Sequence, residues 1–111
     1  LYQRVAERVR SWNEQGNCGL VVGANYPAEL AQVRALCPDL PLLLPGIGAQ
    51  HGDLAQAVRA GADSQGERIL VNVARGIMYA SNGPDFAAAA GQAAERYCRA
   101  INEARENRPI P

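Results

Sequence analysis

Three short apolar runs alternate with segments of helical periodicity, and this alternation constrains the fold more than any other feature of the sequence. The runs are CGLVVG (18–23), LPLLLP (40–45) and RILVNVA (68–74). Between them lie NYPAELAQVRALCP, in which Pro27 suits a first helical turn, and DLAQAVRAGA (53–62). Because parallel strands need crossover connections, strands that alternate with helices form a parallel sheet. The pattern therefore predicts an α/β fold.

Helical patterns also flank the three runs. Residues 1–15 are predicted to be helical, with Gly16 as the stop, and a last helix is predicted from about 85 to 105. The buried side of this last helix is expected to contain Phe86, Ala90, Ala93, Tyr97, Ile101 and Ala104.

Three parallel strands do not close a domain, because an open sheet leaves an apolar edge without partners. The simplest resolution is that residues 1–111 form the C-terminal part of a single TIM (β/α)8 barrel domain, a fold of ~250 residues. This part would contain about three βα units and a preceding helix. The chain also begins inside a helix, at Leu1, as a segment of a longer protein would. The N-terminal strands of the barrel are therefore expected to lie outside this chain.

Composition argues against several classes of partner. The 11 Lys plus Arg residues balance 11 Asp plus Glu residues, so no broad electrostatic field favours nucleic acid or an anionic membrane. No apolar run approaches the ~20 residues of a membrane span. All 11 basic residues are arginine. Any mechanism that needs a lysine is therefore incomplete within these residues.

The cysteines fit no metal-binding pattern. Cys18, Cys37 and Cys98 are odd in number, and their spacing matches no zinc site. We expect three buried free thiols in a reducing cytoplasm, and no metal site.

Glycines gather where the second apolar run ends. In LPGIGAQHGD (44–53), Gly46, Gly48 and Gly52 allow backbone N–H groups to approach an anion, and Gln50 adds a side-chain amide. Ligands of parallel α/β folds meet the carboxyl ends of the strands. Tight turns also need glycine, so this loop alone fits a structural role about as well as a phosphate site.

An arginine follows the third run. Arg75, in NVARGIMYAS, presents a guanidinium that can bind phosphate oxygens through two donors. An isolated arginine more often forms a surface ion pair. In barrels, however, the loops after the last two strands commonly share the phosphate site. A glycine-rich loop and an arginine on consecutive strand ends therefore favour phosphate binding.

Three polar residues near these loops receive simpler interpretations. His51 is interpreted as an ordinary loop histidine rather than a titrating group. Asp53 is expected to cap the following helix rather than act as a general base. Asn72, on the third run, is assigned no chemistry.

Three motifs taken together resemble a known family. GLVVGANYPAEL, LLLPGIGAQHGD and NVARGIMYAS resemble the last three strand–loop units of orotidine 5′-phosphate decarboxylase, in particular its longer bacterial subfamily, over about residues 18–83. The resemblance implies a TIM-barrel carbon–carbon lyase that converts orotidine 5′-monophosphate to UMP and carbon dioxide in pyrimidine biosynthesis. It also implies a cytoplasmic homodimer that works without metal or organic cofactor.

The resemblance also implies roles for individual residues. The Gln50 and Arg75 side chains would bind the substrate phosphate, with backbone N–H groups from Gly48 and Gly76, and Pro45 would close over the pyrimidine. The catalytic lysine and aspartate array of the family lies on earlier strands, where the lysine protonates the carbon that loses carbon dioxide. This segment would therefore supply phosphate-binding loops and no catalytic residue.

Two residues depart from the family pattern, and two alternative functions remain open. His51 stands where the family pattern suggests glycine, and Ala74 where serine commonly precedes the arginine. Another phosphate-binding TIM-barrel enzyme, such as a sugar-phosphate decarboxylase or isomerase, would share Gln50 and Arg75. A non-catalytic nucleotide-binding module would also be compatible with a chain that contains no lysine.

Overall fold

The computed structural model describes residues 1–48 and 51–107, and for residues 51–53 it describes the backbone only. The elements, in chain order, are α1 (Tyr2–Trp12), the 3-10 helix η1 (Asn13–Gln15), β1 (Leu20–Val21), α2 (Pro27–Leu36), β2 (Leu42–Leu44), α3 (His51–Gly61), β3 (Ile69–Val71), α4 (Arg75–Met78) and α5 (Phe86–Glu106). Pro27 opens α2, as expected, and Gly16 ends η1 with a φ of 66°. The predicted alternation of strands and helices is confirmed.

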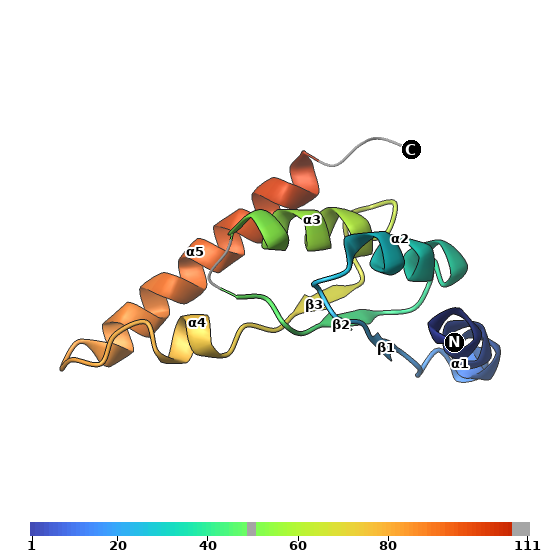
Figure 1. Ribbon diagram of the computed structural model, residues 1–111, viewed down its shortest axis with the longest axis horizontal. Coiled ribbons are helices and arrows are strands. Elements are labelled where there is room, and N and C mark those ends of the chain that lie inside the picture. The colour runs from blue at the N-terminus through green and yellow to red at the C-terminus, as the bar shows by residue number, and fades with distance from the viewer. Residues whose placement is uncertain (49–50, 108–111) are drawn as a thin grey trace.

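The strands form one parallel sheet in the order β1-β2-β3 (Figure 1). Each strand is shorter than its apolar run, but the interstrand hydrogen bonds continue into the following loops. The Ala24 amide donates to the Pro45 carbonyl oxygen at 3.0 Å, and the Asn72 amide donates to the Leu44 carbonyl oxygen at 3.1 Å. The loops after the strands are thus held next to one another by the sheet itself.

One face of the sheet packs against helices. Leu42 and Leu44 point to this face and are fully buried in a core with Leu30 of α2 and Leu54 of α3. Figure 1 shows α2 and α3 side by side along the sheet, with α5 running across α3. Gly61, the last residue of α3, allows close packing, because a Cβ there would lie 3.2 Å from Leu44 Cδ1. Burial of leucine side chains from both layers therefore stabilises this arrangement.

The opposite face of the sheet is apolar and exposed. Val21 pairs with Leu43, and Leu43 pairs with Leu70, so the three side chains form a row across the strands. Their exposed fractions are 69% for Val21, 38% for Leu43 and 63% for Leu70. Both faces of the strands are therefore apolar, but the described residues cover only one of them.

Several sequence-based expectations are wrong. Helix α3 begins at His51, so Asp53 lies inside its first turn and not at the capping position. Phe86 is 63% exposed, because α5 begins there, beyond the elements on which its later turns pack (Figure 1). Cys37 is buried, but Cys18 is only half-buried and Cys98 is exposed on α5.

Arg34 is the one charged residue that is buried within the described part of the chain. Its guanidinium donates hydrogen bonds to five backbone carbonyl oxygens: Gly61 at 2.6 Å, Leu40 at 2.8 Å, Arg68 at 2.9 Å, Cys37 at 3.0 Å and Pro38 at 3.3 Å. These carbonyls belong to the end of α3 and to the segments that enter β2 and β3. Burial lowers the pKa of Arg34 from its ordinary value.

Candidate functional site

The predicted site residues follow the carboxyl ends of β2 and β3. Pro45 comes directly after β2 and is half-buried, and Gly48 is exposed further along the same loop. Arg75 and Gly76 form the first turn of α4, after β3. In Figure 1 these segments lie to the left of the strands, whereas α1 lies to the right. Gln50 falls outside the described residues.

Tyr97 of α5 connects the two predicted phosphate-binding loops. Its hydroxyl donates a hydrogen bond to the Gly48 carbonyl oxygen at 3.2 Å. The same hydroxyl lies against Gly76, where an added Cβ would overlap it and would also lie 3.1 Å from the ring carbon Cζ. The tyrosine is only 8% exposed, so α5 fixes the ring in place. The structure therefore brings Gly48 and Gly76 to one side chain, although they belong to different loops.

The glycines of these loops differ in how far the structure requires them. Gly46 has a φ of +87°, which disfavours any other residue, and its Cβ position lies 3.6 Å from Asn25 Nδ2. Gly76 needs the absence of a side chain because of Tyr97. At Gly48, by contrast, an added Cβ would meet no described atom within 4 Å. Neither a positive φ nor packing against a described atom explains a glycine at position 48.

Arg75 differs from the arginines that stabilise the fold. Its side chain is exposed, and it forms no hydrogen bond or ion pair with any described residue. Arg34 and Arg105, in contrast, donate to backbone carbonyl oxygens, Arg105 to Gly66 at 2.6 Å. The surface ion pair that would have been the ordinary role of Arg75 is therefore not formed with the described part of the chain. The guanidinium is available at the start of α4.

Other residues near the loops contribute no comparable feature. Asn72 is exposed, and only its backbone is hydrogen-bonded among the described residues. His51 is the first residue of α3. The described side chains contain no group of three His, Cys, Asp or Glu residues placed to hold a metal ion.

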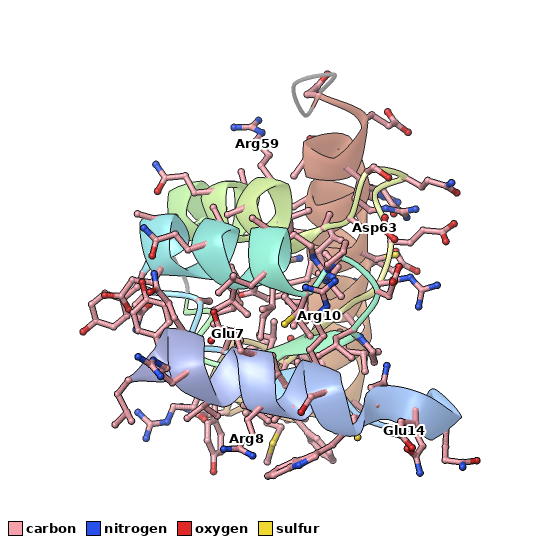
Figure 2. All side chains as sticks on the ribbon, turned by 90° about the vertical axis from the view of Figure 1, so that its right-hand side faces the viewer. Glu7, Arg8, Arg10, Glu14, Arg59 and Asp63 are labelled. Atoms are coloured by element: carbon pink, nitrogen blue, oxygen red, sulfur yellow. The ribbon has the colours of Figure 1, made fainter. Side chains whose placement is uncertain are left out.

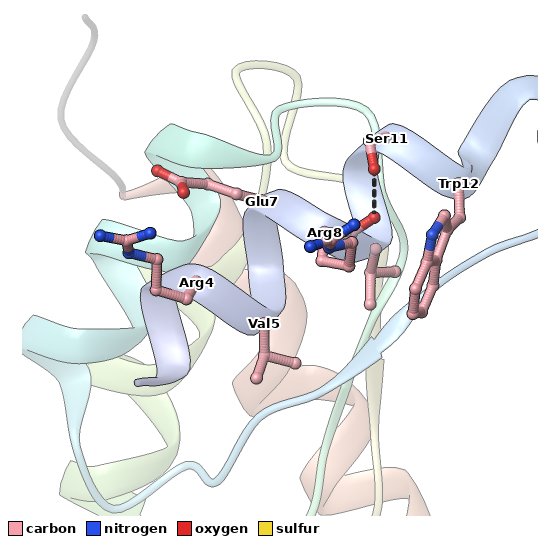
Figure 3. A pocket seen from close by; sticks show the side chains of 7 residues that line it. Arg4, Val5, Glu7, Arg8, Ser11 and Trp12 are labelled. Atoms are coloured by element: carbon pink, nitrogen blue, oxygen red, sulfur yellow. Dashed lines mark hydrogen bonds between the residues drawn. The ribbon is translucent and has the colours of Figure 1, made fainter.

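A hollow of about 550 Å³ lies on the surface of α1 (Figure 3). All its lining residues come from this one helix, among them Val5, Arg8 and Trp12, and the Ser11 hydroxyl donates to the Arg8 carbonyl oxygen at 2.7 Å. Figure 2 shows charges of both signs on this helix, including Glu7 and Arg10. The hollow lies away from the strand ends and gathers no convergent polar groups. None of the helices in the described ranges is apolar over the length that a membrane crossing needs.

Sequence reasoning missed two features of the site. Helix α4 was expected to be a loop, and Tyr97 was expected only to be buried. The sequence did contain one signal, which is a tyrosine on a helix face otherwise rich in alanine. A buried tyrosine hydroxyl usually has a hydrogen-bond partner, so this position predicts such a partner. The identity of that partner depends on tertiary structure and could not be read from the sequence.

Comparison with known proteins gives a consistent result. The chain is 55% identical over 103 residues to orotidine 5′-phosphate decarboxylase of Azoarcus sp., matching 92% of this chain and 38% of the relative. It is 53% identical over 105 residues to the enzyme of the same name from Roseiflexus castenholzii, matching 94% of this chain and 39% of that relative. No family model matches the chain.

Solved structures agree with the sequence comparison. The OMP decarboxylase of Leishmania donovani matches with a TM-score of 0.76 and 44% identity, over 95% of this chain and 38% of that chain. The UMP synthase of Leishmania donovani matches with a TM-score of 0.77 and 46% identity, over 95% of this chain and 22% of that chain. The expectation of a part of a TIM barrel is therefore confirmed. In sequence and in fold, the chain is similar to a segment of orotidine 5′-phosphate decarboxylases that spans about 38% of their length.

Proposed function

We propose that the protein carrying this chain decarboxylates orotidine 5′-monophosphate to UMP, and that this chain supplies the phosphate-binding loops. The observation that carries the proposal is the meeting of Gly48 and Gly76 at Tyr97, with the exposed guanidinium of Arg75 next to Gly76 in the sequence. Loops after consecutive strands, followed by a short extra helix, are the usual phosphate site of TIM barrels. The similarity to named decarboxylases supplies the identity of the substrate.

In this proposal each residue has a distinct role. Arg75 binds two phosphate oxygens through its guanidinium, and Gln50 donates from its side-chain amide. Gly48 and Gly76 donate backbone N–H groups, and Pro45 contacts the pyrimidine. The phosphate lies away from the carbon that reacts, so its binding energy is used to position the base and to support the transition state.

The catalytic groups are proposed to lie outside this chain. Decarboxylation breaks the bond between the ring carbon and the carboxylate, and the electron pair stays on the ring carbon. A lysine that stabilises this charge and then donates a proton gives UMP. The chain contains no lysine, so it cannot supply that group. Residues 1–111 would thus be one part of a single barrel domain.

The apolar row of Val21, Leu43 and Leu70 fits this proposal. The inward side chains of TIM barrels form packed layers contributed by different strands. The exposed row would face that interior and be covered by the remaining strands. We further propose that the complete protein is a cytoplasmic homodimer that binds no nucleic acid or membrane. A sugar-phosphate enzyme or a nucleotide-binding module is less well supported, because the relatives are named as decarboxylases.

The proposal is tested by complementation. The 111-residue chain is expressed alone, and also fused to the part of the Azoarcus relative that it does not match. UMP formation and sedimentation are measured for both proteins, with that part alone as the control. We expect turnover from the fusion only, and self-association of the chain alone through its exposed apolar row.

Three results would contradict the proposal. UMP formation by the chain alone would overturn the mechanism, because no lysine is present. A stable monomer of the chain alone would overturn the assignment of its exposed face to a barrel interior. A folded fusion that forms no UMP would contradict the proposed decarboxylase activity.

A further inference from the structure

We infer that the Tyr97 hydroxyl is a positioning group that sets the separation of the two phosphate-binding loops, an inference that rests on the proposed function. Tyr97 lies on α5, which belongs to neither loop. It is not among the residues expected to touch the substrate. Its role would be to fix where Gly48 and Gly76 present their backbone groups.

The geometry carries this inference in two steps. The first step is the hydrogen bond of 3.2 Å from the Tyr97 hydroxyl to the Gly48 carbonyl oxygen. This bond holds the Gly48 carbonyl group in place and so limits where the backbone N–H of the same residue can lie. The loop is thereby anchored at Gly48, its last described residue before α3.

The second step is the contact on the other side of the hydroxyl. Gly76 approaches it so closely that no Cβ fits between them, and Val73 closes the same space at 3.2 Å from that Cβ position. Gly76 follows Arg75 in the first turn of α4, so the position of this turn also depends on the tyrosine. One oxygen atom is thus in contact with both loops.

The anchor is rigid compared with what it holds. Tyr97 is buried in the middle of a 21-residue helix that packs on α3 and α4. Gly48, in contrast, is exposed on a loop. A buried ring on a long helix has few alternative positions, so it can hold the exposed Gly48 backbone in one place. This arrangement is what preorganised binding of a phosphate requires.

The experiment compares phosphate-dependent and phosphate-independent binding. Dissociation constants for UMP and for uridine are measured with the full-length protein that carries this chain, before and after Tyr97→Phe. The substitution removes the hydroxyl and leaves the ring. We expect UMP binding to weaken about five- to tenfold, and uridine binding to stay within about twofold.

The matched control is Tyr2→Phe. This substitution also removes a tyrosine hydroxyl that forms a hydrogen bond, to Gln32, but it does so between α1 and α2. We expect neither dissociation constant to change with this control. The ratio of UMP affinity to uridine affinity should therefore respond to Tyr97 and not to the loss of a tyrosine hydroxyl in general.

The outcomes separate the inference from the proposed function. If the unsubstituted protein binds UMP no better than uridine, the proposed phosphate site fails. If it prefers UMP and Tyr97→Phe keeps the same preference, the inference alone is overturned. Equal weakening of UMP and uridine binding, or loss of folding, would assign Tyr97 a general structural role and would also overturn the inference.

Discussion

The guanidinium of Arg34 donates from Nε to the carbonyl oxygen of Gly61 at 2.6 Å, which joins α2 to the last residue of α3. The other guanidinium nitrogens reach carbonyls that precede β2 and β3, including Leu40 and Arg68. This buried group therefore lies at the entry ends of the strands, whereas the candidate site lies at their exit ends. The two ends of the sheet give separate predictions for stability and for binding.

Arg34→Met is expected to destabilise the protein by about 3 kcal/mol or more, because it leaves several buried carbonyl oxygens without donors. Arg34→Lys should restore only part of this loss, since one ammonium group cannot reach acceptors spread around a planar guanidinium. The free energy of unfolding of both variants is measured by denaturant unfolding of the full-length protein. Arg59→Met is the matched control, because Arg59 is exposed on α3 (Figure 2). An Arg34→Met protein as stable as this control would contradict the prediction.

Asp63 should make stability depend on pH. Burial raises the pKa of this carboxyl, but two hydrogen bonds and two charges outweigh burial and lower the pKa overall. The hydrogen bonds come from the amides of Glu67 at 2.8 Å and Gln65 at 2.9 Å. The charges are those of Arg34 and of Arg68, whose Nε lies 3.4 Å from Asp63 Oδ2.

A carboxyl with a lowered pKa in the folded state stabilises the protein fully above its unfolded-state pKa of about 3.9. This stabilisation is lost as the pH falls through the lower pKa of the folded state. Asp63→Asn should therefore reduce stability near pH 6 by about 1 kcal/mol and reduce it much less near pH 3. Melting temperatures across this range measure the difference, and a difference independent of pH would contradict the assigned cause.

Arg75→Ala should weaken substrate use without affecting the fold. In the proposed site, loss of the Arg75 contact with phosphate would cost about 2–5 kcal/mol, so KM for the proposed substrate, orotidine 5′-monophosphate, should rise by orders of magnitude. Because remote binding also supports the transition state, kcat/KM should fall more than kcat. Arg96→Ala, at an exposed position of α5, is the control and should leave the kinetics unchanged. Unchanged kinetics for Arg75→Ala would remove this residue from the site.

Gly48 and Gly76 should respond differently to substitution. Gly48→Val is expected to weaken UMP binding while the melting temperature stays near that of the unsubstituted protein, since there is space for a Cβ. Gly76→Ala is expected to lower stability by about 1–3 kcal/mol, because its Cβ would overlap the Tyr97 hydroxyl. Adding Tyr97→Phe to Gly76→Ala should recover part of that stability, as a double-mutant cycle would show. If the stability changes of Gly76→Ala and Tyr97→Phe simply add in the cycle, the contact between Gly76 and the Tyr97 hydroxyl is contradicted. If the Gly48→Val protein is unfolded, Gly48 has a structural role in its turn.

The sequence was sufficient to predict the order and type of most elements. The three apolar runs and the helical periodicities between them are local signals, and they led to the parallel sheet that the structure shows. Helix α4 was missed because RGIM covers only four residues, which is too short for a periodic pattern. The exposure of Phe86 and Cys98 was missed for another reason. A helical stripe shows which face is apolar, but not how far the neighbouring elements extend along it.

The candidate site was predictable in outline. Glycines after one strand and an arginine after the next are visible in the sequence, and the parallel order places them at the same edge of the sheet. The assignment of phosphate contacts to Gly48, Gln50, Arg75 and Gly76, and of a pyrimidine contact to Pro45, remains a prediction. The hydrogen bond between Tyr97 and Gly48 joins residues 49 positions apart, so no local pattern could show it.

Each strand of the sheet pairs with the next strand along the chain, and this order matters during translation. Leu20 of β1 pairs with Leu42 of β2, and Leu42 pairs with Ile69 of β3. One helix lies between the two strands of each pair in the sequence. The paired residues lie 22 and 27 positions apart, so each pairing closes a loop that contains one helix. A ribosome that has released β2 has already supplied the partner of β1, and β3 can join a pair that exists. Each strand after β1 therefore leaves the ribosome when the strand with which it pairs has already been synthesised.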